Sequence, residues 1–385
     1  MTDIPFLFSE EHDAFRDSVR RLAETEFAGG YLARATTEAF PRAETNKLAE
    51  HGLLGLGIAP EYGGQGADCL MAGIACEEVA KVDFNLAYMV FGALLPSQIV
   101  GHVMDPGTRE DWSRAIASGE RIVAAGITEP GAGSDNSRMR CRATAVDGGF
   151  TLSGEKTSVT LAAHADGAFV FANTDPDAGR RGIGCFLVDL DDPSVSRQTF
   201  SDPGFRPLGR GSLTFDDTFV PATHQIGQIG RGIPLILNEF EFTRPLLALM
   251  VLGCAETALR MAGEYVKQRE AFGQVLSRNQ GVSFKLAEHE TYLEAVRCLS
   301  YRALALRVAG RSARKEAAMA KWLGPKVALE AINEAVILHG HVGWSTEMPL
   351  MQMLLDVSGL QIGDGTPQIQ KLIIARELLG REATG

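Results

Sequence analysis

Hydrophobic and polar positions follow different patterns in successive parts of this chain of 385 residues. Residues 1 to about 120 have helical spacing. Ser9 stands where an N-cap is expected, and Phe15, Val19 and Leu22 fall on one face of the helix that would follow it. The first part of the chain is therefore predicted to be helical.

Two further features of this part bear on where its helices lie. A glycine-rich break at residues 63–66 precedes an apolar stretch at residues 69–103, which we interpret as helical. Thr108, which is followed by acidic residues, has the sequence of a helix start. We expect another helix from that point.

The pattern changes to a two-residue alternation after residue 119, which is typical of strands. Glycine, aspartate and proline separate the short alternating runs, which lie at residues 168–172, 184–190 and 212–220. A glycine-rich segment at residues 227–232 superficially resembles a dinucleotide fingerprint. It follows no β-α-β unit and has the wrong spacing, so we interpret it as a loop between domains.

From Pro234 onward the helical spacing returns, with Leu293, Val296, Leu304 and Val308 on one face. Helices, then strands, then helices predict a mixed protein whose elements are segregated, the α+β class. We predict an N-terminal all-α domain at 1–120, a middle β domain at 121–230 and a C-terminal α-helical domain at 231–385.

Composition restricts the partners of this protein. The net charge is −11, which disfavours nucleic acid and anionic membranes. We expect no membrane span, because no apolar run approaches the roughly 18 residues needed to cross a bilayer. The N-terminus lacks the pattern of a signal or transit peptide. Scattered cysteines indicate reduced thiols in a cytoplasmic protein, and no metal site is expected because the histidines have no metal-binding spacing.

The segment at residues 362–374 carries the clearest chemistry. Asp364 lies between two glycines, where the backbone can approach a ligand closely. Thr366 has the position of an N-cap, Pro367 that of the first helical residue, and Gly380 that of the stop. An acid beside the positive end of a helix suggests proton abstraction next to a carbonyl. The alternative is an ordinary acidic loop residue at a helix start.

A second segment, residues 127–135, has three turn-forming residues, small hydroxyls and almost no apolar side chains, so it is predicted to be a loop with exposed amides. Together with residues 362–374, it closely resembles the acyl-CoA dehydrogenase family. The resemblance covers essentially the whole chain. Further matching segments lie, in family order and spacing, at residues 154–160, 243–245, 269–274 and 339–340.

This resemblance implies a fold and a reaction. The fold has an N-terminal helical domain, a middle domain that is barrel-like or a β-sandwich, and a C-terminal four-helix bundle. The reaction is the FAD-dependent α,β-dehydrogenation of an acyl thioester, carried on CoA or on a carrier protein. The family also implies an electron-transferring flavoprotein as acceptor, and a homo-oligomer, most simply a tetramer. Acyl length, branching or a ring, and dimer versus tetramer, stay open.

The resemblance implies that Asp364 is the catalytic base. The usual family residue is glutamate, so the carboxylate here is set back by about 1.5 Å. Arg244 is expected to brace the loop, or else to form a plain ion pair. Some relatives take their base from the position of Thr243, which cannot serve. Glu239 and Glu241 remain as weaker candidates, or as acids in the first turn of a helix.

The resemblance also implies a set of FAD contacts. Ser158 departs from the family, which usually has an aromatic residue there. Arg269 would reach the FAD pyrophosphate of a neighbouring subunit, or else would form a surface ion pair with Glu264 or Glu270. The implied contacts are Thr128, Gly133, Ser134, Ser158, Thr160, Arg269, Phe272, Gln280, His339, Gly340, Thr366 and Gln368.

Two other functions remain open at this point. Ser158 and Asp364 also allow a different flavin reaction on the same fold, such as an acyl-thioester oxidase, a monooxygenase or an enoyl-thioester reductase. A non-catalytic flavin-binding scaffold subunit is a further possibility. We expect the acyl pocket floor in residues 88–99 and around residues 246–250, although these residues could equally serve helix packing.

Overall fold

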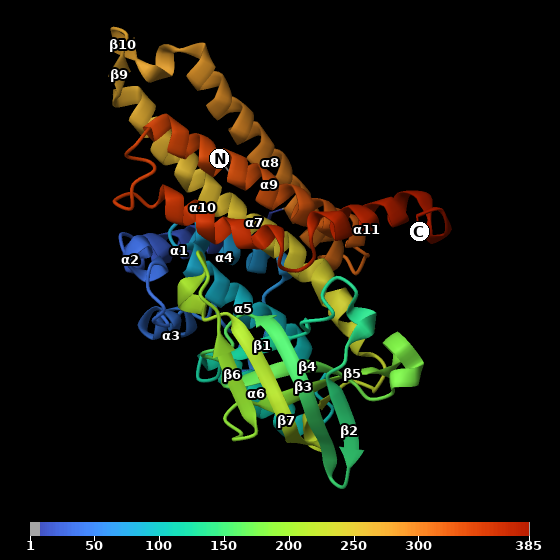
Figure 1. Ribbon diagram of the computed structural model, residues 1–385. Helices are drawn as coiled ribbons and strands as arrows, with labels where there is room; N and C mark the ends of the chain where they lie inside the picture. The colour runs from blue at the N-terminus through green and yellow to red at the C-terminus, as the bar shows by residue number, and fades with distance from the viewer. Residues whose placement is uncertain (1–7, 385) are drawn as a thin grey trace.

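The computed structural model describes residues 8–384 and contains helices at both ends of the chain around a central sheet (Figure 1). The expectation about a leader concerns residues that lie outside this range. Ser9 caps the first helix as predicted, because its side chain accepts from the amide of His12. The N-terminal helices are α1 (Glu10–Glu26), α2 (Tyr31–Ala35), α3 (Arg42–Glu50), α4 (Cys69–Ala80), α5 (Phe84–Val100) and α6 (Pro106–Ser118).

Two predicted helix boundaries in this part were wrong. The apolar stretch at 69–103 forms two helices, because the carboxylate of Asp83 caps α5 by accepting from the amides of Asn85 and Leu86. The helix expected to start at Thr108 begins at Pro106 instead. Asp105 is its N-cap and accepts from the amide of Thr108, so Thr108 lies inside the first turn.

The strands form one mixed sheet in the order β6-β7-β3-β2-β4-β5-β8, and β1 pairs with β4 in parallel. The pairing of β3 with β7 is antiparallel, and its register shifts between Lys156 and Val159. Such a bulge changes the direction in which its side chains point. The strands are β1 (Val123–Gly126), β2 (Arg142–Val146), β3 (Gly149–Val159), β4 (Gly167–Asn173), β5 (Ile183–Asp189), β6 (Val195–Thr199), β7 (Gly211–Pro221) and β8 (Gln225–Ile226).

A bundle of long helices follows the sheet, and residues 227–231 connect the two, as predicted for that glycine-rich segment. Figure 1 shows a small hairpin of β9 and β10 at the end of the bundle farthest from the sheet. The C-terminal elements are α7 (Gly232–Gln268), β9 (Glu270–Ala271), β10 (Gln274–Val275), α8 (Gln280–Val308), α9 (Arg314–His339), α10 (Leu350–Ser358) and α11 (Pro367–Leu379).

Helix α7 corrects the expectation that no apolar run approaches membrane-spanning length. It is long enough and contains a window of 18 residues that is apolar enough to cross a bilayer. However, 72% of that window is buried inside the protein, and the buried core of a long helix has the same composition as a membrane span. We therefore assign this helix to the centre of the bundle.

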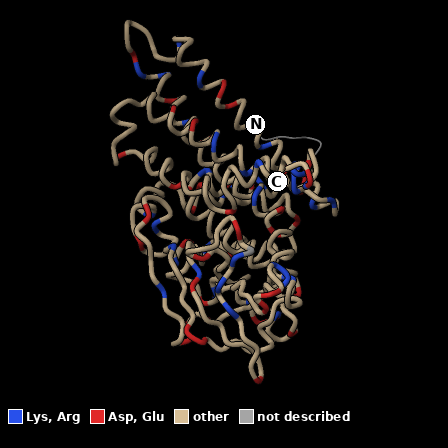
Figure 2. The backbone as a smooth tube through the Cα atoms, turned by 45° about the vertical axis from the view of Figure 1, so that its right-hand side comes forward, with Lys and Arg blue, Asp and Glu red and all other residues tan. Residues whose placement is uncertain are grey.

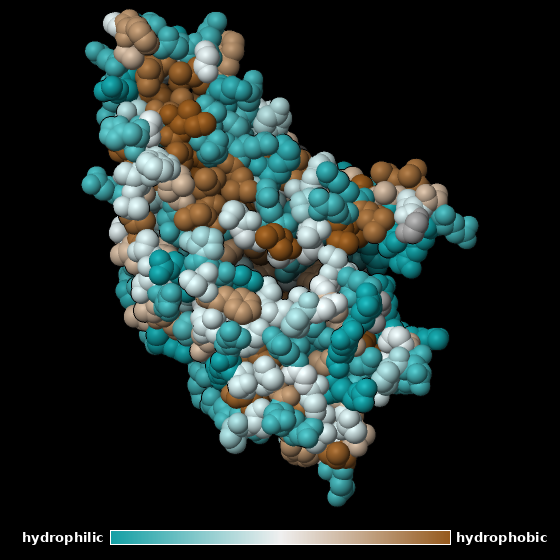
Figure 3. All heavy atoms as spheres, in the orientation of Figure 1, coloured by the Kyte–Doolittle hydropathy of each residue, from teal (hydrophilic) through white to brown (hydrophobic). Residues whose placement is uncertain are grey.

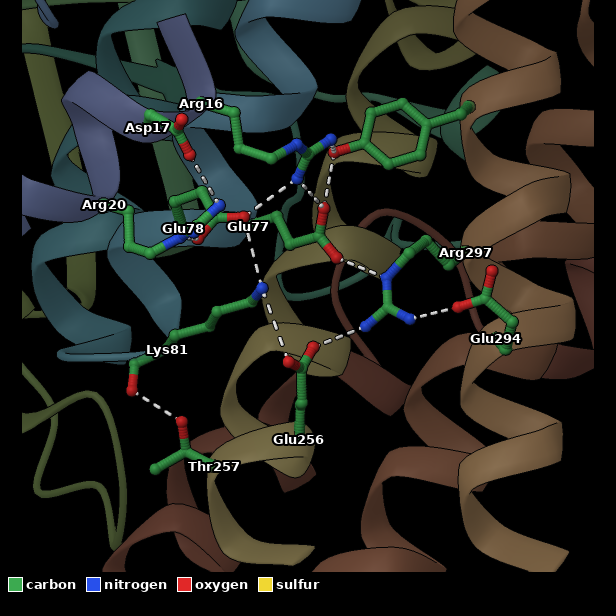
Figure 4. Close-up of polar contacts among 11 residues, drawn as sticks. Arg16, Asp17, Arg20, Glu77, Glu78, Lys81, Glu256, Thr257, Glu294 and Arg297 are labelled. Atoms are coloured by element: carbon green, nitrogen blue, oxygen red, sulfur yellow. Dashed lines mark hydrogen bonds and ion pairs between the residues drawn. The ribbon is translucent and has the colours of Figure 1, made fainter. Parts of the chain in front are cut away.

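A buried ionic network joins the N-terminal helices to the bundle (Figure 4). The carboxylate of Glu77 on α4 accepts from Arg16 on α1 at 3.1 Å and from Arg297 on α8 at 2.6 Å. Tyr301 donates to the same carboxylate at 2.5 Å. Burial opposes ionisation of Glu77, but Arg297, Lys81 and Arg16 together hold its pKa well below the usual range. The network therefore fixes the two helical parts against each other.

Candidate active site

The loop that carries Asp364 lies just before α11 and has an unusual backbone. Asp364 has a φ of 53° and Gly365 one of 98°, both in the left-handed region. The side-chain amide of Gln370 donates to the carbonyls of both residues at 3.0 Å. Arg244 Nε also donates to the carbonyl of Asp364, at 3.3 Å. The main chain around the acid is therefore held from two sides.

The side chain of Asp364 is held as well. Its Oδ2 accepts from Thr243 Oγ1 at 3.2 Å. Burial raises the pKa of this carboxyl, and the charges of Lys321 and Arg244 oppose the rise. A partly buried carboxylate whose pKa is raised is a stronger base than a free one, and the nearby cations limit that rise.

The side chain of Arg244 contacts the backbone of the loop, at the carbonyl of Asp364, rather than forming a plain ion pair. Its guanidinium lies 4.9 Å from the ring centroid of Phe240. Burial lowers the pKa of Arg244 to about 10, an effect that the charge of Asp364 reduces. The guanidinium is thus a fixed, buried cation beside the acid.

Lys321 on α9 is a site residue that was not predicted from the sequence. Its side chain is buried, and Nζ donates to the carbonyl of Leu360 at 2.7 Å. Leu360 lies just before the loop that carries Asp364, which we call the base loop. Burial lowers its pKa to about 8 against the opposing charge of Asp364. A lysine within the apolar run Ala317–Leu323 was a signal that could have found it.

Glu239 and Glu241 are not first-turn helix acids, because α7 begins at Gly232 and both lie further inside it. Both side chains are buried and paired. Glu239 accepts from Arg307 at 2.7 Å, and Glu241 accepts from Arg314 at 3.1 Å. These pairs fasten α8 and α9 to α7 and do not involve the base loop.

The loop after β1 is anchored by a buried ion pair beneath it. Lys156 Nζ donates to the carboxylate of Glu129 at 2.7 Å, and that carboxylate also accepts from the amide of Cys141 at 3.0 Å. Both charged side chains are buried. Gly133 and Ser134, further along the loop, are exposed, while the carbonyl of Thr128 accepts from the amide of Thr157 at 2.8 Å. The anchor leaves the outer part of the loop free to contact a ligand.

Ser158 occupies the bulge at the end of β3, where its φ is 57°. Its hydroxyl accepts from Arg210 at 2.7 Å. Arg210 in turn makes two hydrogen bonds to the carboxylate of Asp202, at 2.7 and 2.5 Å. A polar link therefore occupies this place, which the family resemblance gives to an aromatic ring.

Tyr88 connects the bulge with the base loop. Its hydroxyl donates to Thr160 Oγ1 at 3.5 Å. Burial and the negative charge of Asp364 raise the pKa of Tyr88. Residues 88, 160 and 364 come from three distant parts of the chain, and the structure brings them to one place. From the sequence, Tyr88 was expected only as part of the acyl pocket floor.

The remaining predicted contacts divide into two groups. Thr366 occupies the N-cap position of α11 as predicted, although its side chain makes no hydrogen bond to the helix. Pro367 is the first residue of α11, Gly380 follows its end, and Gln368 is exposed in its first turn. This group lies beside Asp364. An N-terminus of this kind favours negative charge.

The second group lies at the far end of the bundle (Figure 1). Arg269, Phe272 and Gln280 are exposed in or beside the β9–β10 hairpin. His339 stacks on Tyr265 with ring centroids 4.5 Å apart, which places the end of α9, including Gly340, beside the end of α7. Within one chain this group lies at the opposite end of the bundle from the sheet.

The surface ion pair considered for Arg269 is not present. In the part of the chain from residue 8 to 384, no ion pair involves Arg269, and Glu264 is paired with Lys267 at 2.9 Å. Across the same residues, no three His, Cys, Asp or Glu side chains gather as a metal site.

Comparisons with known proteins identify the family. Profiles described as acyl-CoA dehydrogenase N-terminal, middle and C-terminal domains match residues 9–120, 124–218 and 230–379. The chain belongs to the acyl-CoA dehydrogenase family. Its three-domain α+β fold is that of the family, and it is an FAD-dependent oxidoreductase that acts on CH–CH bonds of acyl-CoA.

Individual relatives match this chain over nearly its whole length. An acyl-CoA dehydrogenase of Bacillus subtilis is 34% identical over 97% of this chain and 99% of that protein. A short-chain specific acyl-CoA dehydrogenase of Clostridium acetobutylicum is 32% identical over the same shares. The structure of butyryl-CoA dehydrogenase from Megasphaera elsdenii superposes with a TM-score of 0.92 at 30% identity, over 97% of this chain and 99% of that one. These relatives do not favour another flavin reaction for this chain.

Proposed function

We propose that Asp364 is the base that removes the α-proton of an acyl thioester in this acyl-CoA dehydrogenase. The observation that carries the proposal is a partly buried carboxylate, its pKa raised by burial, on a loop held by Arg244, Gln370 and Thr243. A raised pKa improves its match to a weakly acidic carbon acid. FAD, when bound, accepts the hydride from the β carbon.

The base loop also supplies stabilisation for the charge that develops on the thioester oxygen. The amide of Asp364 and the N-terminus of α11 lie at the same place, and both favour negative charge. The carboxylate is about 1.5 Å shorter in reach than a glutamate. Because its main chain is anchored, the loop cannot swing forward, so the substrate has to bind closer to the loop.

The residues present suit FAD. The exposed residues 130, 131, 133 and 134 and the hydroxyls of Thr128, Ser158 and Thr160 would hold its ring system. Thr366 and Gln368 would meet its phosphates at the start of α11. Arg269 has an open guanidinium at the far end of the bundle, which suits a pyrophosphate. These two groups lie too far apart for one chain to complete one site. The site therefore combines two subunits.

Assembly into a homo-oligomer follows from that division, and we infer a tetramer. Figure 3 shows apolar side chains gathered along the bundle, and several large ones are exposed, including Phe272, Phe284, Ile337 and Trp344. An apolar surface of this kind is expected at a subunit interface. Charged residues of both signs are distributed over the rest of the backbone (Figure 2). We place the protein in the cytoplasm, in keeping with its free cysteines.

The electron acceptor that we propose is an electron-transferring flavoprotein. A relative that is 32% identical over 97% of this chain is a caffeyl-CoA reductase–Etf complex subunit of Acetobacterium woodii. A structure reported for an electron-transferring flavoprotein of Acidaminococcus fermentans contains a chain that superposes with a TM-score of 0.93.

The decisive experiment mixes the FAD-loaded protein with acyl-CoA esters of different lengths and branching under anaerobic conditions. Bleaching of the bound flavin is the expected result. A second arm with acyl-carrier-protein esters tests the thioester carrier, and a third with oxidised electron-transferring flavoprotein, which should reoxidise the bleached flavin, tests the acceptor. A protein that binds FAD but is reduced by no acyl thioester would contradict the proposal.

A further inference from the structure

Tyr88 on α5 is fixed in place by two aromatic rings. Its ring is edge-on to Phe91, with centroids 5.1 Å apart, and edge-on to Phe205, with centroids 5.3 Å apart. Phe91 belongs to the same helix, whereas Phe205 comes from the segment between β6 and β7. The phenol is therefore clamped between the N-terminal helices and the middle domain.

Phe205 is itself held rigidly against the end of α10. Its amide donates to Asp356 Oδ1 at 2.9 Å. A Cβ added at Gly359 would lie 2.5 Å from the Phe205 ring, so the ring lies directly on that glycine. Tyr31 and Asn85 of the N-terminal helices donate to the other oxygen of Asp356, at 2.7 and 3.0 Å. This arrangement prevents the Tyr88 ring from swinging aside when a substrate enters.

The Tyr88 hydroxyl contacts Thr160 just after the bulge, and the charge of Asp364 acts on it. Among residues 8–384 its hydrogen bond is the one to Thr160, at 3.5 Å, which is the outer limit for such a bond. The pKa of Tyr88 is raised by burial and by Asp364, so the phenol keeps its proton and remains a donor. A half-buried donor that is poorly satisfied favours a ligand that offers an acceptor.

The surroundings of this hydroxyl are also polar. Its partner on Thr160 is a hydroxyl, and the charge of Asp364, which accepts a hydrogen bond from the Thr243 hydroxyl, also acts on it. A pocket for a plain alkyl chain is lined by hydrocarbon. Here a phenol held by two aromatic rings presents its hydroxyl toward Thr160 within reach of the charge of Asp364, so an acyl group bound beside that acid would meet a hydrogen-bond donor.

We propose that Tyr88 is a specificity-determining residue that selects a short acyl group bearing a hydroxyl or similar acceptor on its β or γ carbon. The inference rests on the proposed function. The reaction is unchanged: the α-proton goes to Asp364 and the β-hydride to FAD. A β-hydroxyl substrate then gives an enol that tautomerises to the 3-oxo thioester, and a γ-hydroxyl substrate gives the 4-hydroxy-2-enoyl thioester.

The test uses pairs of substrates in which a hydroxyl replaces a methyl group of similar size. The pairs are 3-hydroxybutanoyl-CoA with 3-methylbutanoyl-CoA, and 4-hydroxybutanoyl-CoA with pentanoyl-CoA. Anaerobic flavin reduction gives kcat/KM for each ester. We expect the wild-type protein to prefer the hydroxyl member of at least one pair by about tenfold or more, because a site built to donate a hydrogen bond rejects the analogue that lacks the acceptor.

Tyr88→Phe removes the hydroxyl and keeps the ring. It should lower kcat/KM for the preferred hydroxyl substrate by about tenfold while leaving its methyl counterpart unchanged or faster. Tyr292→Phe is the matched control, since Tyr292 is half exposed on α8 and should alter neither ratio. A wild-type preference for the methyl member in both pairs, or unchanged ratios in Tyr88→Phe, overturns this inference and leaves the dehydrogenase function standing. No flavin reduction by any ester overturns both.

Discussion

Replacing Asp364 by asparagine separates the chemistry of the base from the structure of its loop. The two side chains have the same shape, so the hydrogen bond from Thr243 at 3.2 Å can persist to the amide oxygen. The contacts of Arg244 and Gln370 are made to backbone carbonyls and do not depend on the side chain. The substitution therefore removes the proton acceptor while the loop stays in place.

The expected magnitude follows from this separation. A positioned base contributes about 10²–10⁴-fold to the rate of proton transfer. That range corresponds to about 2.7–5.4 kcal/mol in the activation barrier. Stability should not fall, because burial raises the pKa of Asp364 and so already disfavours its charged form in the folded protein. The thermal midpoint of Asp364→Asn is expected to be unchanged or slightly higher.

Stopped-flow absorbance of the bound flavin, mixed anaerobically with an acyl-CoA that reduces the wild-type protein, measures the effect directly. In the wild-type protein the rate should rise with pH through the raised pKa of Asp364, since only the carboxylate accepts a proton. Asp216→Asn makes the same exchange at an exposed position on β7 and serves as control. A rate for Asp364→Asn within threefold of wild type, with FAD bound, would refute the reasoning and favour another base or a non-catalytic role.

Three further predictions concern residues around this site. Lys321→Met removes the hydrogen bond to Leu360 and a charge that lowers the pKa of Asp364, so the pH profile of flavin reduction should move to higher pH. Asp356→Asn leaves two of four buried donors without an acceptor and should lower the free energy of unfolding by about 2–6 kcal/mol, which thermal or urea denaturation would measure. Burial raises the pKa of Asp356 to about 6, so the free energy of unfolding should be highest below about pH 4 and should fall as the pH rises through 6, where the buried carboxyl ionises; the variant should lack this dependence. Arg269→Ala should weaken FAD binding by about 10–100-fold, seen as flavin release on dilution, whereas unchanged retention would contradict a shared site.

Local sequence determined the elements whose boundaries depend on a few adjacent residues. Ser9 caps α1 through its side chain, Thr366 occupies the N-cap position of α11, and Gly380 follows that helix, because start and stop signals act over a single turn. The alternating runs became strands for the same reason, since their period is set by the strand itself. Asp105 and Thr108 can both begin a helix, and the prediction chose Thr108, whereas Asp105 is the N-cap.

Only the tertiary structure decided which distant residues share the site. No pattern in the sequence relates Tyr88 to Thr160 and Asp364, because their proximity results from packing a helix, a bulged strand and a loop together. The same holds for Lys321, whose reduced pKa exists only once the bundle has excluded water around it. The apolar length of α7 was likewise ambiguous until its neighbours covered it. Short-range patterns specify elements, but distances and dielectric environments arise only when those elements pack.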